Sequence, residues 1–116
     1  MSNYKYTGTV DVSKQPNLAS LKGRTVLVTG AGSGIGEIIS EKYAENGSFV
    51  ALCDVNEELG KGVEKKLLEK GYNVKFIKCN VLSWEEQLAA FKEAIASSPK
   101  NAIDVVVANA GKVNYI

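Results

Sequence analysis

The chain has 116 residues, of which 45% are hydrophobic and 23% are charged, and its formal net charge is +1. These values are typical of one soluble globular domain, and they indicate neither a nucleic-acid nor a membrane partner. Because the chain contains no histidine, histidine-based catalysis and most zinc sites are excluded, and no metal site is expected. No apolar run approaches the length of a membrane span, and the polar N-terminus does not resemble a signal peptide, so we expect a cytoplasmic location.

Residues 1–20 are polar and show no sustained hydrophobic periodicity, so we interpret them as an N-terminal arm. An organised domain over residues 21–116 is expected to follow. It begins with a strand at 24–29. Residues 25–29 form an unbroken apolar and β-branched run, which is typical of a strand buried on both faces of a parallel sheet.

Four glycines at alternate positions from 30 to 36 follow this strand, and a helix is predicted from Ser33 or Gly34 to Glu45. The order of strand, glycine turn and helix places backbone N–H groups and the positive end of a helix at the carboxyl end of a strand. That arrangement suits a pyrophosphate. The common G-x-G-x-x-G spacing fails in both registers, whereas T-G-x-x-x-G-x-G fits Thr29, Gly30, Gly34 and Gly36.

This turn, Thr29–Gly36, resembles the cofactor turn of the short-chain dehydrogenase/reductase family and matches it at every fixed position. Two alternatives exist for the glycines. Methyltransferases that bind S-adenosylmethionine also use G-x-G-x-G, although they usually carry an acid where this chain has Val28. A glycine-rich loop without any ligand is the other.

The second predicted strand, 49–53, ends at Asp54, which lies 18 positions after Gly36. An acid at the tip of this strand can accept hydrogen bonds from the adenosine ribose hydroxyls of NAD and would repel the 2′-phosphate of NADP. No lysine or arginine in the glycine turn would offset that repulsion. We therefore predict NAD as the cofactor, with a helix cap or a solvated loop acid as the alternative role of Asp54.

The remaining elements alternate in the same way, with helices at 56–70 and from about 84 onward and strands at 74–79 and 103–108. Gly60 and Gly62 are expected to weaken the second helix by up to about 1 kcal/mol each. Ser83 and Glu86 form an expected capping box for the third helix. The residues predicted to face the core are Ile38, Ile39 and Tyr43 in the first helix, Leu59, Val63 and Leu67 in the second, and Trp84, Leu88, Phe91 and Ile95 in the third.

The two cysteines, Cys53 and Cys79, lie near the ends of two predicted strands and do not have a metal-binding spacing. We interpret them as buried, reduced thiols, with a disulfide between neighbouring strands as the alternative.

Two later segments extend the family resemblance. Asn80 and Val81 stand where the family commonly has an acid and an aliphatic residue against the adenine ring, and Asn109, Ala110 and Gly111 resemble its N-N-A-G motif. For Asn109, a contact with the ligand and a purely backbone-holding role are both open. The resemblance implies cofactor contacts at Gly30, Ser33, Gly34, Ile35, Gly36, Asp54, Asn80, Val81, Asn109, Ala110 and Gly111.

The implied fold is α/β, a Rossmann-type parallel sheet truncated to about four strands in the order 3-2-1-4, with helices on both faces. The family transfers protons with a Tyr-x-x-x-Lys pair assisted by a serine, but none of the five tyrosines here precedes a lysine at that spacing. We therefore expect no catalytic residue in this chain.

The apolar strand 103–108 would form an uncovered sheet edge, so the chain is expected either to be part of a longer enzyme or to pair with another copy in a homo-oligomer. Three functions follow from these expectations. The first is the NAD-binding portion of an oxidoreductase that interconverts a small secondary alcohol and a ketone. The second is a non-catalytic NAD or adenosine-nucleotide binding module, and the third is a self-associating structural fragment.

Overall fold

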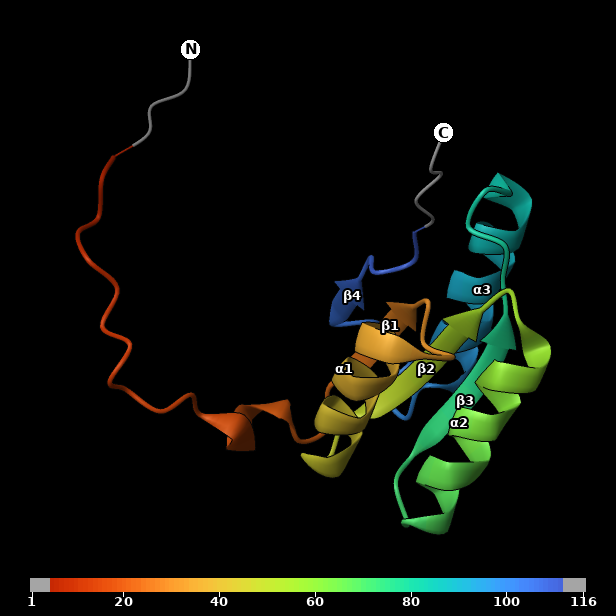
Figure 1. Ribbon diagram of the computed structural model, residues 1–116, viewed down its shortest axis with the longest axis horizontal. Coiled ribbons are helices and arrows are strands. Elements are labelled where there is room, and N and C mark those ends of the chain that lie inside the picture. The colour runs from red at the N-terminus through yellow and green to blue at the C-terminus, as the bar shows by residue number, and fades with distance from the viewer. Residues whose placement is uncertain (1–4, 112–116) are drawn as a thin grey trace.

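The fold is a four-stranded parallel sheet in the order β3-β2-β1-β4, seen in a computed structural model that describes residues 5–111 (Figure 1). This confirms the predicted α/β class and strand order. The strands are β1 (Thr25–Thr29), β2 (Phe49–Asp54), β3 (Val74–Lys78) and β4 (Val105–Val107).

Strand β4 is shorter than the predicted 103–108 because the chain turns away at both ends. At its start, Asp104 uses both its backbone N–H and its carboxylate to bind the backbone of Thr25. At its end, the Asn109 N–H donates to the Val107 carbonyl at 3.0 Å, which closes a tight turn.

Helices cover both faces of the sheet, as expected. Helices α1 (Gly34–Glu45) and α2 (Glu57–Glu69) lie on one face, and α3 (Trp84–Ser97) lies on the other (Figure 1). Alternate residues of β1 point in opposite directions, so Val26 and Val28 join one core while Leu27 joins the other. Burial on both faces explains why the strands are continuous apolar runs.

The faces that the helices bury differ from the prediction. In α3, Trp84 is 73% exposed and Leu88 and Ile95 are also exposed, whereas Ala90 and Ala94 are buried and Phe91 is half-buried. The small alanines let α3 lie close to a sheet face that already carries side chains such as Ile77. Of the predicted apolar stripe on α3, Phe91 packs against the core as expected, but Ala90 and Ala94, which the stripe did not include, are the buried residues of this helix.

In helices α1 and α2 the prediction is confirmed in part, since Ile39 and Tyr43 pack against the core and Val63 and Leu67 belong to it. In α1, Ile38 is 70% exposed and Ile39 and Tyr43 are partly buried. The buried residues of α1 are Gly36, Ser40 and Ala44. In α2, Val63 and Leu67 are buried as predicted, but Leu59 is 46% exposed and Gly60 is buried in its place.

The N-terminal segment is exposed and does not belong to the hydrophobic core. Residues 5–17 are exposed and extend away from the sheet, followed by a short 3-10 helix, η1 (Leu18–Leu21) (Figure 1). Residues 1–4 of the expected arm lie outside the described range. Among the helices within residues 5–111, none combines the length and the apolar character that crossing a bilayer requires.

Asp104 anchors β4 to β1 and makes this junction sensitive to acid. Its Oδ2 accepts from the Thr25 N–H at 2.8 Å and its Oδ1 from Lys100 Nζ at 3.0 Å. The Thr25 N–H and then the Lys100 ammonium lower the pKa of Asp104 below its ordinary value. A carboxylate whose pKa is lowered by folding stabilises the protein above its unfolded pKa, and this contribution is lost as the pH falls through the folded value.

We therefore expect the wild type to lose part of its unfolding free energy as the pH falls below about 4. Asp104→Asn should be less stable at neutral pH but lose less on acidification, because it has no proton to gain. Urea denaturation at neutral and acidic pH measures the stability of each protein and its loss on acidification. Equal acid sensitivity in the wild type and the variant would contradict the assignment.

Candidate functional site

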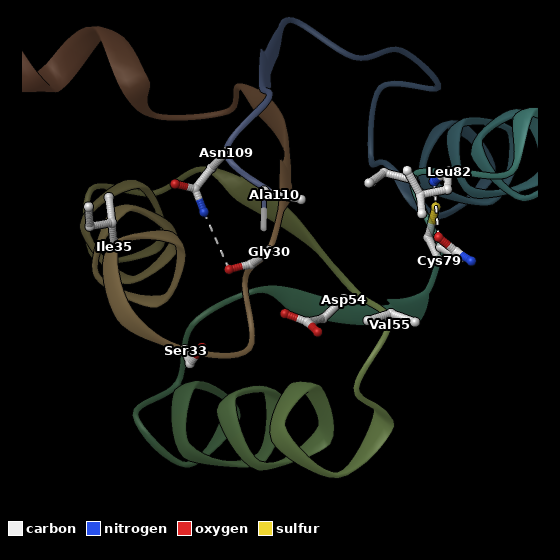
Figure 2. Close-up of a pocket in the computed structure, with 12 residues that line it drawn as sticks. Gly30, Ser33, Ile35, Asp54, Val55, Cys79, Leu82, Asn109 and Ala110 are labelled. Atoms are coloured by element: carbon white, nitrogen blue, oxygen red, sulfur yellow. Dashed lines mark hydrogen bonds between the residues drawn. The ribbon is translucent and has the colours of Figure 1, made fainter. Parts of the chain in front are cut away.

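A cavity of about 630 Å³ opens where the carboxyl ends of the strands meet (Figure 2). Nine of the eleven residues predicted from the sequence line it, and they come from segments far apart in the chain. These nine are Gly30, Ser33, Ile35, Asp54, Asn80, Val81, Asn109, Ala110 and Gly111. Val55, Cys79 and Leu82 also line the cavity and were not predicted, whereas Gly34 and Gly36 do not reach its wall.

The N-terminus of α1 faces this cavity without a side-chain cap. Asn56 caps α2 through the Leu59 N–H and Ser83 caps α3 through the Glu86 N–H, but the Ser33 side chain makes no such bond to α1. The first N–H groups of a helix have no acceptor inside it. In the described part of the chain, those of Gly34 to Gly36 donate to no protein group. This end of α1 can therefore receive an anion.

Glycine is required in the turn for two different reasons. Gly30 and Gly34 have φ values of +69° and +56°, in the left-handed region that favours glycine. Gly36 has no such angle, but a Cβ there would lie 2.1 Å from the Gly30 carbonyl oxygen. Gly36 thus lets α1 lie directly against the end of β1, and the structure places it behind the cavity wall.

Asp54 connects the glycine turn to β2. Its Oδ2 accepts from the Gly32 N–H and its Oδ1 from the Asn56 N–H, both at 2.8 Å. The cap of α2 is Asn56, so Asp54 is not the helix cap of the alternative interpretation. Figure 2 shows its carboxylate between the Gly30–Ser33 turn and the end of the cavity formed by Cys79 and Leu82. Each carboxylate oxygen retains acceptor capacity beyond its backbone bond.

Asn109 and Thr29 together fasten the end of β4 to the glycine turn. The Asn109 amide donates to the Thr29 carbonyl at 3.2 Å and to the Gly30 carbonyl at 3.4 Å. The Thr29 hydroxyl accepts from the N–H groups of Asn109 and Ala110 at 3.1 and 3.0 Å. Of the two roles left open for Asn109, holding the backbone is the one these bonds display. Thr29 is a positioning residue that the motif contained but the predicted site did not.

The loop after β3 is closed by a modified capping box. Glu86 does not reach back to the Ser83 N–H, which donates instead to the Asn80 carbonyl. Its Oε1 accepts from the Asn80 N–H at 3.1 Å, and the Asn80 Oδ1 accepts from the Leu82 N–H at 3.0 Å. Ser83 thus caps α3 as predicted, whereas the Glu86 side chain binds the Asn80 N–H instead of the Ser83 N–H. These bonds fix the loop that carries Asn80 and Val81.

Both cysteines are free and buried, as the sequence indicated. Burial, with a smaller contribution from Cys79, raises the pKa of Cys53 to about 12, and burial together with Glu86 raises the pKa of Cys79. Both thiols are therefore protonated at neutral pH. Within residues 5–111, no group of three or more His, Cys, Asp or Glu side chains is placed to hold a metal ion.

The strand order, the paired helix layers and a cavity at the carboxyl ends of the strands define a Rossmann-type α/β protein. The sequence model of short chain dehydrogenases matches residues 24–115, and the chain belongs to that family. It is a family of oxidoreductases that bind a nicotinamide dinucleotide.

Named relatives agree with this assignment. The chain is 42% identical to a 5'-hydroxyaverantin dehydrogenase of Dothistroma septosporum over 82% of its length and 31% of the relative. It is 40% identical to the NADP-dependent dehydrogenase M3 of a Phoma species over 78% of its length and 26% of the relative. A hydroxysteroid dehydrogenase structure from Escherichia coli superposes with a TM-score of 0.76 at 30% identity, covering 83% of this chain and 41% of that one. The chain thus spans between about a quarter and a third of the length of these curated relatives.

Proposed function

We propose that residues 21–116 form the adenosine and pyrophosphate half of the cofactor site in an NAD-dependent short-chain dehydrogenase acting on a small secondary alcohol or ketone. The observation that carries this proposal is that the uncapped N-terminus of α1 and the Asp54 carboxylate open into one cavity. When bound, the nicotinamide ring would accept or donate the hydride. The catalytic serine, tyrosine and lysine would lie outside these residues.

In this proposal each segment of the cavity wall would hold a different part of the cofactor. The N–H groups at the start of α1, with Ser33, would hold the pyrophosphate, since they converge where a helix N-terminus favours negative charge. Asp54 would accept from the ribose hydroxyls, and Asn80 with Val81 would contact the base. The small residues Ala110 and Gly111 would leave room for the part of the cofactor that leads towards the nicotinamide. The residues present fit the adenosine half of a dinucleotide.

The preference for NAD rests on charge. Asp54 is anionic, its position is fixed by Gly32 and Asn56, and none of the residues that line the cavity is a lysine or arginine. A 2′-phosphate beside this carboxylate would have no cation to neutralise it. Because some relatives are named NADP-dependent, the choice of cofactor has to come from the residues of this chain.

The open edge of β4 supports the remaining parts of the proposal. Val106 is 48% exposed there, and an unpaired apolar strand favours pairing with further polypeptide of the same chain or with a second copy. A homo-oligomer is therefore part of the proposed function. A cytoplasmic location, expected from the sequence, is proposed with it.

Calorimetric titration of the purified chain with NAD, NADP and AMP tests the proposal. We expect NAD and AMP to bind. NADP should bind at least about tenfold more weakly than NAD, which corresponds to a difference of about 1.4 kcal/mol in binding free energy. Failure of all three to bind, or a preference for NADP, would contradict it.

Replacing the acid tests its role separately. Asp54→Ala should weaken NAD binding about tenfold, since hydrogen bonds to a charged group are worth about 1.5–3 kcal/mol, and should also reduce discrimination against NADP. Glu58→Ala is the matched control, because Glu58 is an exposed acid near the start of α2 that does not line the cavity. An unchanged ratio of NAD to NADP affinity in Asp54→Ala would refute the ribose assignment.

A further inference from the structure

The first turn of α1 carries one acid, Glu37, close to the helix end that faces the cavity. Its carboxylate forms an ion pair with Lys66 Nζ of α2, the helix that lies beside α1 on the same face of the sheet (Figure 1). The Glu37 side chain is only 28% exposed, so this pair lies partly between the two helices. Lys66 therefore fixes the direction in which the first-turn acid of α1 points.

A second ion pair joins the same two helices further from the cavity. Lys70 Nζ binds the carboxylate of Glu41, which lies one turn after Glu37 along α1. Lys66 Nζ is also 4.0 Å from a Glu41 oxygen. Two lysines of α2 thus hold two acids of α1, but only Glu37 lies in the first turn, where a charge affects the N-terminus of a helix.

Glu37 would compete with an anion for this N-terminus if its side chain were released. Helical side chains lean towards the N-terminus, and the glutamate of a capping box reaches back three residues to bond a free N–H. Glu37 stands three residues after Gly34, whose N–H donates to no protein group in the described part of the chain. Gly34 and Gly36 have no side chains to block this path. A released Glu37 carboxylate can therefore reach the N–H groups that the proposed function assigns to the pyrophosphate.

We propose that Lys66 is a positioning residue for cofactor binding, which holds Glu37 against α2 and so keeps the N-terminus of α1 open to the pyrophosphate. Lys66 does not line the cavity, so it acts through Glu37 and not by contact with the cofactor. This inference rests on the proposed function, because it requires the pyrophosphate to bind at the start of α1. Its effect is expected for ligands that carry the pyrophosphate and not for adenosine alone.

Calorimetric titration of the 116-residue chain with ADP and with adenosine tests this role. Lys66→Met removes the ammonium group and keeps an unbranched side chain. We expect it to weaken ADP binding about threefold, which is the size of effect that a carboxylate exerts at a helix N-terminus. Adenosine has no phosphate for Glu37 to displace, so its affinity should not change.

Replacing the acid shows whether the effect passes through Glu37. Glu37→Ala removes the competing carboxylate, so adding Lys66→Met to this variant should have little further effect on ADP affinity. The two substitutions are therefore expected to be non-additive. An equally large loss of ADP affinity with and without the Glu37 carboxylate would show that Lys66 acts through its own charge, and would overturn the proposal.

Lys70→Met is the matched control. It removes the same charge and an equivalent ion pair between the same helices, but its partner Glu41 lies seven residues after Gly34, about 10 Å along the helix. ADP affinity should therefore stay at the wild-type value. A comparable loss in Lys70→Met, or an equal loss for adenosine in Lys66→Met, would show that the packing of α1 on α2 is responsible, and would also overturn the proposal.

The same titrations separate this inference from the proposed function. If ADP binds the wild type and Lys66→Met leaves its affinity unchanged, the inference is overturned while the proposed function stands. If ADP does not bind the wild type, the proposed function fails and this inference fails with it.

Discussion

Gly36→Ala is expected to destabilise the fold by about 1–3 kcal/mol, the range typical of overpacking a tight interior. The new Cβ would lie 2.1 Å from the Gly30 carbonyl oxygen and 2.7 Å from Asn109 Nδ2. Neither atom can move freely, because Asn109 is bound to the Thr29 and Gly30 carbonyls. Helix α1 would have to shift away from β1, which would also displace the N–H groups that face the cavity.

Urea denaturation and NAD titration should both register this change. A stabilised or unchanged protein would show that α1 does not lie as close to Gly30 as the structure indicates. Gly62→Ala is the control. Gly62 also lies inside a helix, but a Cβ there meets nothing within 4 Å, so alanine should raise stability by up to about 1 kcal/mol through helix propensity.

Gly60→Ala should be destabilising for a different reason, at a residue that does not line the cavity. A Cβ at Gly60 would lie 2.0 Å from Cε2 and 2.4 Å from Cδ2 of the Phe76 ring, which is only 9% exposed. The ring fills the space between α2 and β3, so we expect a loss of about 1–3 kcal/mol despite the better helix propensity of alanine.

The double variant Gly60→Ala/Phe76→Leu tests this explanation. A smaller side chain at position 76 should remove the clash, so the two substitutions together should cost less than the sum of their separate effects. Additive losses in urea denaturation would show that the Phe76 ring is not the obstacle. The Gly62→Ala variant again reports the propensity effect alone.

The strands could be predicted from the sequence because their physical cause is local. Val26 to Val28 and Phe49 to Cys53 are buried on both faces of the sheet, and that requirement produces unbroken apolar runs. Glycines and asparagines end the elements for equally local reasons. The strand order, in contrast, was available only through the resemblance to a known family.

The buried faces of the helices could not be predicted in the same way. The apolar stripe of α3 includes Trp84 and Leu88, yet Ala90 and Ala94 contact the sheet. Which face a helix buries depends on how near the sheet lies, and small residues are favoured where the approach is close. Periodicity counts large apolar residues and therefore does not detect such a face. Gly60 against Phe76 is a second example.

Most of the cavity lining followed from motifs, but three of its residues did not. Val55, Cys79 and Leu82 were not predicted because they belong to none of the family motifs. Their positions directly after Asp54 or beside Asn80 were the available indication, since the carboxyl ends of neighbouring parallel strands meet at one edge. The bonds that hold Asp54 to Gly32 depend on the tertiary structure and have no counterpart in sequence spacing.

The central claim is that the adenosine half of NAD binds between the N-terminus of α1 and Asp54, and mapping amide NMR shifts of the chain on titration with NAD tests it most directly. We expect the largest shifts at the amides from Gly30 to Gly36 and at Asp54, with smaller ones at Asn80, Val81 and Asn109. Shifts confined to other surfaces, for example around Leu18 and Tyr43, or no shifts at all, would contradict the account.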